Sequence, residues 1–176
     1  GAYLSGFALI NFPYSWWLFL LLPAAALVPG LLAFTIGLFV FRGRIESGPY
    51  FALITLALSL LTFQVATNWV DVTGGFNGLG NIPGLPGVDG FETLYYIIAF
   101  ALTVSIAVVA WLIKSPIGVI WKAISENERR LSYFGYDTPL LKAVAFGMSD
   151  VLGGVAGVFY APHQGLVTPQ LTGFVL

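Results

Sequence analysis

The sequence predicts an all-α membrane protein, a polytopic bundle of transmembrane helices, and three observations lead to this fold class. The chain is 58% hydrophobic and 9% charged, whereas soluble domains carry about 25% charged residues. Its apolar residues gather in runs that are long enough to cross a bilayer as helices. The seven lysines and arginines fall in two stretches, residues 42–44 and 114–142. We therefore expect a single transmembrane domain over residues 1–176.

The apolar runs predict about four complete spans, at residues 16–41, 50–70, 93–113 and 140–161. The first run has 26 residues and would be about 39 Å long as a helix, which is enough to cross with tilt. Pro23 and Pro29 are expected to kink it. Residues 1–10 are too short to span and are expected to be the end of a truncated segment. The chain starts without Met and begins and ends in apolar sequence, so it is expected to be a fragment of a longer protein. Its first residues lack a charged region and a cleavage pattern, so no signal peptide is expected.

Two spans carry polar side chains that need a partner. Thr55, Ser59 and Thr62 recur at helical spacing and form one face, the hydroxyl stripe. These hydroxyls either bond back to their own helix or line a path for a polar substrate, and the pattern leaves both interpretations open. Asp150 falls near the middle of the last span, where a carboxylate costs about 3 kcal/mol. It is therefore expected to face the bundle or water.

The last span also carries small residues at every fourth position. Gly153, Gly157 and Ala161 make a face that allows another helix to approach closely. We predict that this face packs against a neighbouring helix.

A polar central segment, about residues 115–139, separates the last two spans and holds six of the fifteen charged residues. On a helical wheel the apolar residues of its first half share one face, and charged residues such as Glu126 and Arg129 lie opposite. Gly135 offers a helix stop. Such an amphipathic helix either rests on the membrane surface or docks onto a soluble partner, and the pattern does not decide between the two.

The glycine-rich loop, about residues 71–92, lies between the second and third spans. It contains seven glycines and two prolines, so little regular structure beyond turns is expected. It carries the loop acids, Asp71, Asp89 and Glu92, and no basic residue. Because every lysine and arginine lies on the opposite side of the predicted topology, the central segment is expected to be cytoplasmic and the glycine-rich loop external.

Several classes of function are excluded or disfavoured by what the sequence contains. The net charge of −1, without a basic cluster, gives no reason to expect nucleic acid as a partner. The chain has no cysteine, and its single histidine, His163, cannot build a metal site alone. No Walker motif is present, and no cluster of titratable residues resembles an active site. We expect no metal, no cofactor and no catalytic residue in this chain.

A series of short motifs runs in order through most of the chain. They are Arg42-Gly43-Arg44, Gly48-Pro49-Tyr50-Phe51-Ala52, Ile54-Thr55-Leu56-Ala57, Thr73-Gly74-Gly75, Asn77-Gly78-Leu79, Tyr95-Tyr96, Ser115-Pro116 with Gly118, Ala123-Ile124, Glu126-Asn127-Glu128, Gly135-Tyr136, Lys142 with Ala145-Phe146, Gly153 with Gly157, Tyr160-Ala161-Pro162, Gly165 and Thr168-Pro169. In this order and spacing the chain resembles the branched-chain amino acid permease family of bacterial ABC importers. It is most similar to the second of their two membrane subunits. Permeases for urea and short-chain amides belong to the same group.

The resemblance implies a multi-pass subunit of the bacterial inner membrane that catalyses no reaction itself. Its partners would be a second permease subunit, two cytoplasmic ABC ATPase subunits, a periplasmic substrate-binding protein and the lipid bilayer. Residues 125–135 would then be the coupling segment that inserts into the ATPase, with contacts from Glu126, Asn127, Glu128, Arg129 and Gly135. The loop acids are expected to help receive the binding protein, and the hydroxyl stripe, with Asp150 near it, to border the substrate path.

This sequence departs from the family pattern at three positions. Family members usually carry arginine where Val119 and Ser125 stand, and a small residue where Asp150 stands. These differences bear on the ATPase contacts and on the apolar character of the last span. An ATP-independent channel or secondary carrier, with Asp150 as the coupling carboxylate, is the alternative from another class. A membrane enzyme is a third, disfavoured reading.

Overall fold

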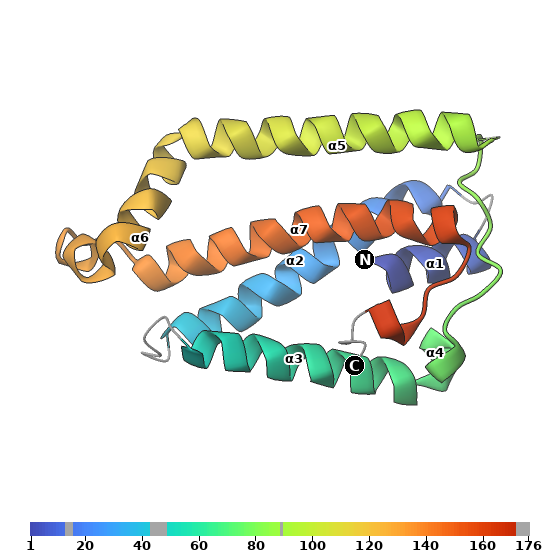
Figure 1. The fold of residues 1–176 in the computed structure, drawn as a ribbon, viewed down its shortest axis with the longest axis horizontal. Coiled ribbons are helices and arrows are strands. Elements are labelled where there is room, and N and C mark those ends of the chain that lie inside the picture. The colour runs from blue at the N-terminus through green and yellow to red at the C-terminus, as the bar shows by residue number, and fades with distance from the viewer. Residues whose placement is uncertain (13–15, 43–48, 89, 172–176) are drawn as a thin grey trace.

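The computed structural model describes residues 1–12, 16–42, 49–88 and 90–171. Within these residues the chain is helical and runs back and forth along one long axis (Figure 1). The elements are α1 (Ala2–Asn11), α2 (Leu18–Arg42), α3 (Pro49–Asn68), α4 (Val70–Thr73), η1 (Gly75–Asn77), α5 (Phe91–Lys114), α6 (Pro116–Tyr133), α7 (Thr138–Gln164) and η2 (Pro169–Leu171). The all-α membrane fold class is confirmed.

The long helices coincide with the predicted spans to within three residues at every end. α2, α5 and α7 are each long and apolar enough to cross a membrane. Ala52–Asn68 of α3 qualifies only together with Val70–Asn77, which holds α4 and η1, and the chain bends by 87° between the two parts. The described residues therefore supply three spans, or four if the bent pair counts as one. α2 continues as one helix through both Pro23 and Pro29.

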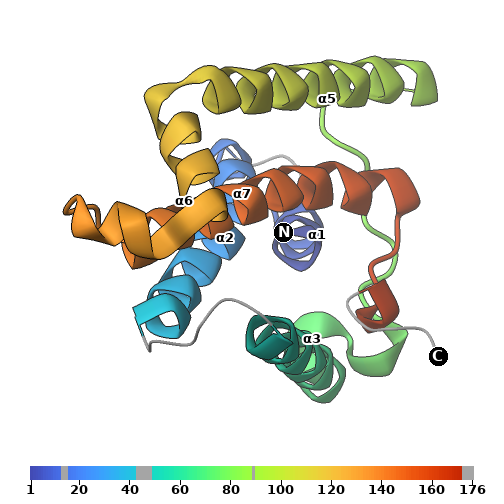
Figure 2. The ribbon, with the colours of Figure 1, turned by 60° about the vertical axis from the view of Figure 1, so that its left-hand side comes forward.

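The tightest packing in the molecule joins α2 and α7, which run antiparallel side by side (Figures 1 and 2). Small residues bring the two backbones together along the whole contact. A Cβ atom added to Gly154 would lie 2.9 Å from Cα of Ala26, and one added to Gly147 would lie 3.0 Å from the carbonyl oxygen of Gly30. Contacts this close are made by residues without large side chains, as in other membrane helix pairs. This pair forms the rigid centre of the fold.

α1 is a helix that packs against both members of this pair, although it is too short to span. Its Ser5 and Leu9 are fully buried. The Ser5 hydroxyl lies 3.0 Å from the carbonyl oxygen of Ala2 and 3.4 Å from that of Gly157 on α7. Leu9 belongs to a buried cluster with Leu18, Ile82, Ala161 and Val167. The N-terminal residues are thus an integral part of the described core.

The glycine-rich loop is more ordered than its composition predicts. The Thr73 hydroxyl caps the bent end of α3, with its oxygen 2.5 Å from the carbonyl oxygen of Ala66 and 2.7 Å from that of Trp69. Further along, Leu79 and Val167 exchange backbone hydrogen bonds of 2.8 and 2.9 Å in an isolated bridge. Interactions with the segment that follows α7, which are distant in sequence, therefore supply the order that local propensity lacks.

α3 and α5 stand apart from the central pair (Figure 2). α3 packs chiefly on α4, η1 and η2. α5 faces α7 across two cavities of about 360 and 450 Å³, lined mostly by apolar side chains. The described structure is therefore a compact α1–α2–α7 core with two spans attached mainly at their ends.

Candidate functional site

The central segment forms α6, which lies across one end of the molecule between the end of α5 and the start of α7 (Figure 1). Its first turn is specified locally. Ser115 is the N-cap, its side-chain oxygen accepting from the backbone N–H of Gly118 at 3.3 Å, and Pro116 occupies the first turn. Both features are typical helix starts. The predicted amphipathic helix is present, and none of its residues is fully buried.

α6 is interrupted at Asn127. The backbone there is extended, with φ of −159° and ψ of 94°. The Asn127 side-chain oxygen accepts a 3.0 Å hydrogen bond from the backbone N–H of Arg130. Asn127 thus acts as the N-cap of the second piece. α6 consists of two helical pieces, residues 116–126 and 128–133, and the predicted site residue Asn127 is the joint between them.

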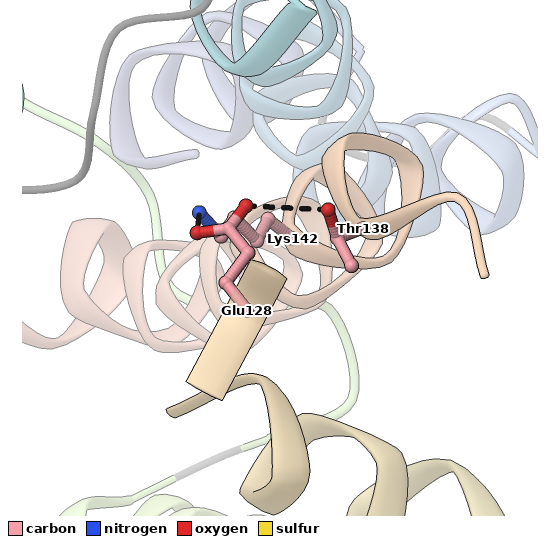
Figure 3. A network of polar contacts seen from close by, with 3 residues as sticks. All are labelled: Glu128, Thr138 and Lys142. Atoms are coloured by element: carbon pink, nitrogen blue, oxygen red, sulfur yellow. Dashed lines mark hydrogen bonds and ion pairs between the residues drawn. The ribbon is translucent and has the colours of Figure 1, made fainter. Parts of the chain in front are cut away.

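Glu128 directs its carboxylate toward α7 rather than away from the protein (Figure 3). Its Oε1 accepts from the Thr138 hydroxyl at 3.2 Å, and its Oε2 forms an ion pair with Nζ of Lys142. The Lys142 ammonium also lies 5.6 Å from the centre of the Phe41 ring on α2, within the range of a cation–π contact. One glutamate therefore connects α6 to α7, and its lysine partner continues the connection to α2.

A second polar contact joins the two helices. Nε1 of Trp121, in the first piece of α6, donates to the carbonyl oxygen of Leu141 at 2.9 Å. α7 itself begins with Asp137 as N-cap, its carboxylate accepting from the N–H of Leu140 at 3.2 Å. The start of α7 is thus well defined and lies against both pieces of α6.

The remaining predicted residues of α6 lie on its outer surface. Glu126 and Arg129 are exposed, and Gly135 follows the helix with φ of +86°, a conformation that favours glycine. Sequence reasoning missed the aromatic tip, Tyr133 and Phe134, whose side chains are 89% and 74% exposed. Two consecutive aromatic residues before a helix-ending glycine were the available signal. Two such side chains held in water are typical of residues that a partner covers.

Basic residues concentrate at the end of the molecule where α6 lies, which we call the basic end. Those in the described residues are Arg42, Lys114, Lys122, Arg129, Arg130 and Lys142. Arg44 lies outside the described residues. At the opposite end, Asp71 and Glu92 occupy the first turns of α4 and α5 and are exposed, and Asp89 lies outside the described residues. The structure thus separates cations from the described loop acids along its long axis.

The hydroxyl stripe lies on α3, and its threonines bond within their own helix. Thr55 donates to the carbonyl oxygen of Ala52 at 3.0 Å, and Thr62 to that of Leu58 at 2.8 Å. Asp150 is exposed on α7, whose principal neighbours are α1, α2, α5 and α6. α7, which carries Asp150, is thus not among the main packing partners of α3. A role of the hydroxyl stripe and of Asp150 in a substrate path stays a prediction.

The small residues of α7 are divided between two faces. Ala161 is fully buried, and a Cβ atom added to Gly157 would lie 2.6 Å from the backbone nitrogen of Ala2. Gly153 points elsewhere, since a Cβ atom there meets nothing within 4 Å. Its neighbour Gly154 makes the close approach to α2 instead. Packing through Gly153 stays a prediction that only a further chain or segment would satisfy.

In the described part of the chain, no group of three or more His, Asp or Glu side chains is placed to hold a metal ion. The described geometry is that of a helix able to bind a partner and to pass on its movement. An amphipathic helix projects charged and aromatic side chains outward at the basic end. Polar contacts fix its inner face to α7, and Lys142 of α7 lies over Phe41 of α2.

Comparison with known proteins identifies the family of the chain. The model of the family described as "Branched-chain amino acid transport system / permease component" matches residues 1–176. The high-affinity branched-chain amino acid transport system permease protein LivM of Salmonella typhimurium is 32% identical over 97% of this chain and 45% of its own length. LivM of Escherichia coli is 31% identical over the same shares. A probable branched-chain amino acid transport permease protein LivM of Methanocaldococcus jannaschii is 24% identical over 78% of this chain and 41% of its own.

The chain thus spans less than half the length of each of these relatives. No solved structure matches it significantly. The family match covers the whole chain, and the described residues supply several membrane helices. The chain belongs to the branched-chain amino acid transport permease family.

Proposed function

We propose that this chain is part of the membrane-spanning permease of an ABC importer that carries branched-chain amino acids across the inner membrane. The observation that carries the proposal is α6, an amphipathic helix that links two spans and projects from the basic end (Figure 1). By the distribution of basic residues, that end is cytoplasmic. ATP hydrolysis takes place in partner subunits, and the energy of that reaction enters the permease through α6.

Docking of α6 onto an ATPase is supported by what its outer surface offers. Glu126 and Arg129 provide charges for orientation, and the aromatic tip provides large rigid side chains for a pocket. Aromatic anchors surrounded by polar contacts are the usual composition of a strong interface. A helix that simply rested on the membrane would place its aromatic side chains with the apolar stripe, whereas these lie after the Asn127 break, next to Gly135.

The substrate assignment rests on the names of the relatives, each of which is described as a branched-chain amino acid permease. Leucine, isoleucine and valine combine an apolar side chain with a zwitterion, so a path for them needs some hydrogen-bonding groups among apolar ones. The hydroxyl stripe on α3 fits that need. The basic end of the bundle therefore serves partner docking, and the membrane spans serve substrate passage.

The test uses the full-length permease in complex with its partner permease, the ATPases and the binding protein, reconstituted in proteoliposomes. Binding protein loaded with leucine is expected to stimulate ATP hydrolysis and to drive leucine uptake. Urea and acetamide serve as competing substrates. Leucine uptake that proceeds without ATP would overturn the importer assignment, and stimulation by urea rather than leucine would overturn the substrate.

Cysteine crosslinking tests the docking surface itself. Single cysteines replacing Glu126, Arg129 and Tyr133 are expected to crosslink to the ATPase in the assembled complex. A cysteine replacing Tyr95 on the exposed part of α5, at the opposite end, is the matched control. Absence of crosslinks from all three positions would refute docking through α6.

A further inference from the structure

We propose that Glu128 is a positioning residue that fastens α6 to the start of α7, and that Lys142 extends this fastening to the end of α2. The group formed by Glu128, Thr138 and Lys142 is the α6–α7 joint (Figure 3). The proposal rests on the function proposed above, because it states how a displacement of α6 reaches the transmembrane helices. It also removes Glu128 from the set of residues that touch the ATPase.

Both carboxylate oxygens of Glu128 are engaged within the chain. Oε1 accepts from Thr138, whose residue is only 4% exposed, and Oε2 pairs with Lys142. The side chains of Glu128 and Lys142 are 33% and 17% exposed. A carboxylate held on both oxygens by one stretch of helix has a fixed direction. It cannot also present itself to a soluble partner without breaking these contacts.

The break at Asn127 would let the two pieces of α6 move independently if neither piece were attached to α7. Trp121 attaches the first piece to Leu141, and Glu128 attaches the second piece to Thr138 and Lys142. Each piece therefore has its own polar contact with the first turns of α7. α6 and the start of α7 move as one body as long as both contacts hold.

Contacts between α7 and α2 continue the connection into the membrane-spanning helices. Lys142 lies over the Phe41 ring of α2. One residue further, Ala143 meets α2 at Gly37, where an added Cβ atom would lie 3.3 Å from Cα of Ala143. The joint thus leads directly into the close-packed α2–α7 pair. At the α5–α6 corner, the Ser115 hydroxyl donates to the carbonyl oxygen of Leu112 at 2.6 Å and accepts from the N–H of Gly118. α6 therefore also packs on the end of α5, but the Ser115 backbone is extended and α5 packs little on α7. A push on α6 therefore moves α7 and α2 together and pivots at Ser115.

The test measures transport and ATP hydrolysis separately in the reconstituted complex. Glu128→Gln and Lys142→Met are expected to retain the ATPase subunits within twofold of wild type and to retain ATP hydrolysis. Substrate uptake per ATP hydrolysed is expected to fall at least tenfold. Lys114→Met, at an exposed lysine at the end of α5, is the matched control and should change neither quantity. The charge swap Glu128→Lys with Lys142→Glu should recover most of the lost coupling.

Two results would overturn the joint. Loss of ATPase retention in Glu128→Gln, unrecovered by the swap, would return Glu128 to the docking surface. An unchanged ratio of uptake to hydrolysis in both single variants would show that the contact carries no motion. Failure of the proposed function looks different, because the wild-type complex itself would then show no ATP-driven uptake.

Distance measurements between spin labels test the rigid-body statement directly. Labels at Val119 on α6 and Leu140 on α7, both exposed, should keep their separation when ATP is added. Labels at Val119 and Trp111 on α5 should change theirs. In Glu128→Gln the first distance should broaden. A first distance that shifts in the wild type on ATP binding would refute the proposal.

Discussion

Replacing Gly154 by alanine tests the central packing of the fold with a magnitude taken from the structure. The new Cβ atom would lie 2.9 Å from Cα of Ala26 and 3.0 Å from its carbonyl carbon, whereas ordinary contact begins at 3.4 Å. α2 and α7 would have to separate locally by at least about 0.5 Å, the difference between 2.9 and 3.4 Å, because the carbonyl oxygen of Ala26 would lie nearer still and backbone atoms cannot rotate away. Overpacking of this kind costs about 1–3 kcal/mol.

Gly153→Ala is the matched control, one residue away on the same helix. A Cβ atom there meets nothing within 4 Å in the described chain. Both substitutions gain the same helix propensity, about 1 kcal/mol relative to glycine, so this contribution cancels when the two variants are compared. The difference in stability between them therefore reports the α2–α7 approach alone. A difference of about 2 kcal/mol corresponds to roughly 30-fold in the ratio of folded to unfolded protein.

The assay heats the isolated full-length permease in detergent and uses size-exclusion chromatography to measure the fraction that stays folded at each temperature. Gly154→Ala should unfold at a lower temperature than Gly153→Ala, which should match or exceed the wild type. Equal stability of the two variants would refute the assigned seam. If the neighbouring helix that the sequence predicts for Gly153 belongs to a partner subunit, Gly153→Ala should weaken the assembled complex while leaving the isolated permease unaffected.

Three further predictions use the full-length complex. Single cysteines along the hydroxyl stripe should react with a small water-soluble thiol reagent while cysteines at Leu56 and Leu60 do not; if no stripe position reacts at any stage of the ATP cycle, the stripe only packs. Replacing both residues of the aromatic tip by serine should lower ATPase retention at least tenfold without reducing membrane insertion, and unchanged retention would count against docking through the tip. Neutralising the loop acids should slow association with the binding protein at low salt more than it changes the dissociation rate, as rim charges do; an association rate that is the same at low and high salt in the wild type would contradict it.

The positions of the membrane helices could be predicted from sequence because hydrophobic length depends on composition alone. α2, α5 and α7 follow from it directly, and so does the placement of basic residues at one end. The face of α7 that packs on α2 could not be predicted as reliably from the sequence. Gly153 and Gly154 are adjacent, and a shift of one residue turns the face of a helix by about 100°. The choice between them depends on where Ala26 lies on α2, which no local pattern records.

The inner contact of Glu128 was hidden for a similar reason. A helical wheel assumes one continuous helix, but Asn127 breaks α6 and changes the direction of every later side chain. The partner Lys142 is fourteen residues away, beyond the turn at Gly135. Local spacing can assign Glu126, in the first piece, to an outer face. It cannot assign Glu128, because its surroundings are set by how α7 returns against α6.

Asp150 shows how the rigid core constrains what surrounds it. Its carboxylate is exposed on α7, where contact with lipid would cost about 3 kcal/mol. α7 cannot turn to bury it, because rotation would break the close approaches of Gly147 and Gly154 to α2. Nor do the cavities toward α5 offer it a partner, since their linings are mostly apolar and do not include Asp150. Within the described residues, the amino group of Gly1 interacts electrostatically with this carboxylate. Water or polar groups of another chain or segment would complete its surroundings in the assembled permease. A water-filled substrate path beside α7 would provide that surrounding, and it would be bordered by the same helix that the α6–α7 joint moves.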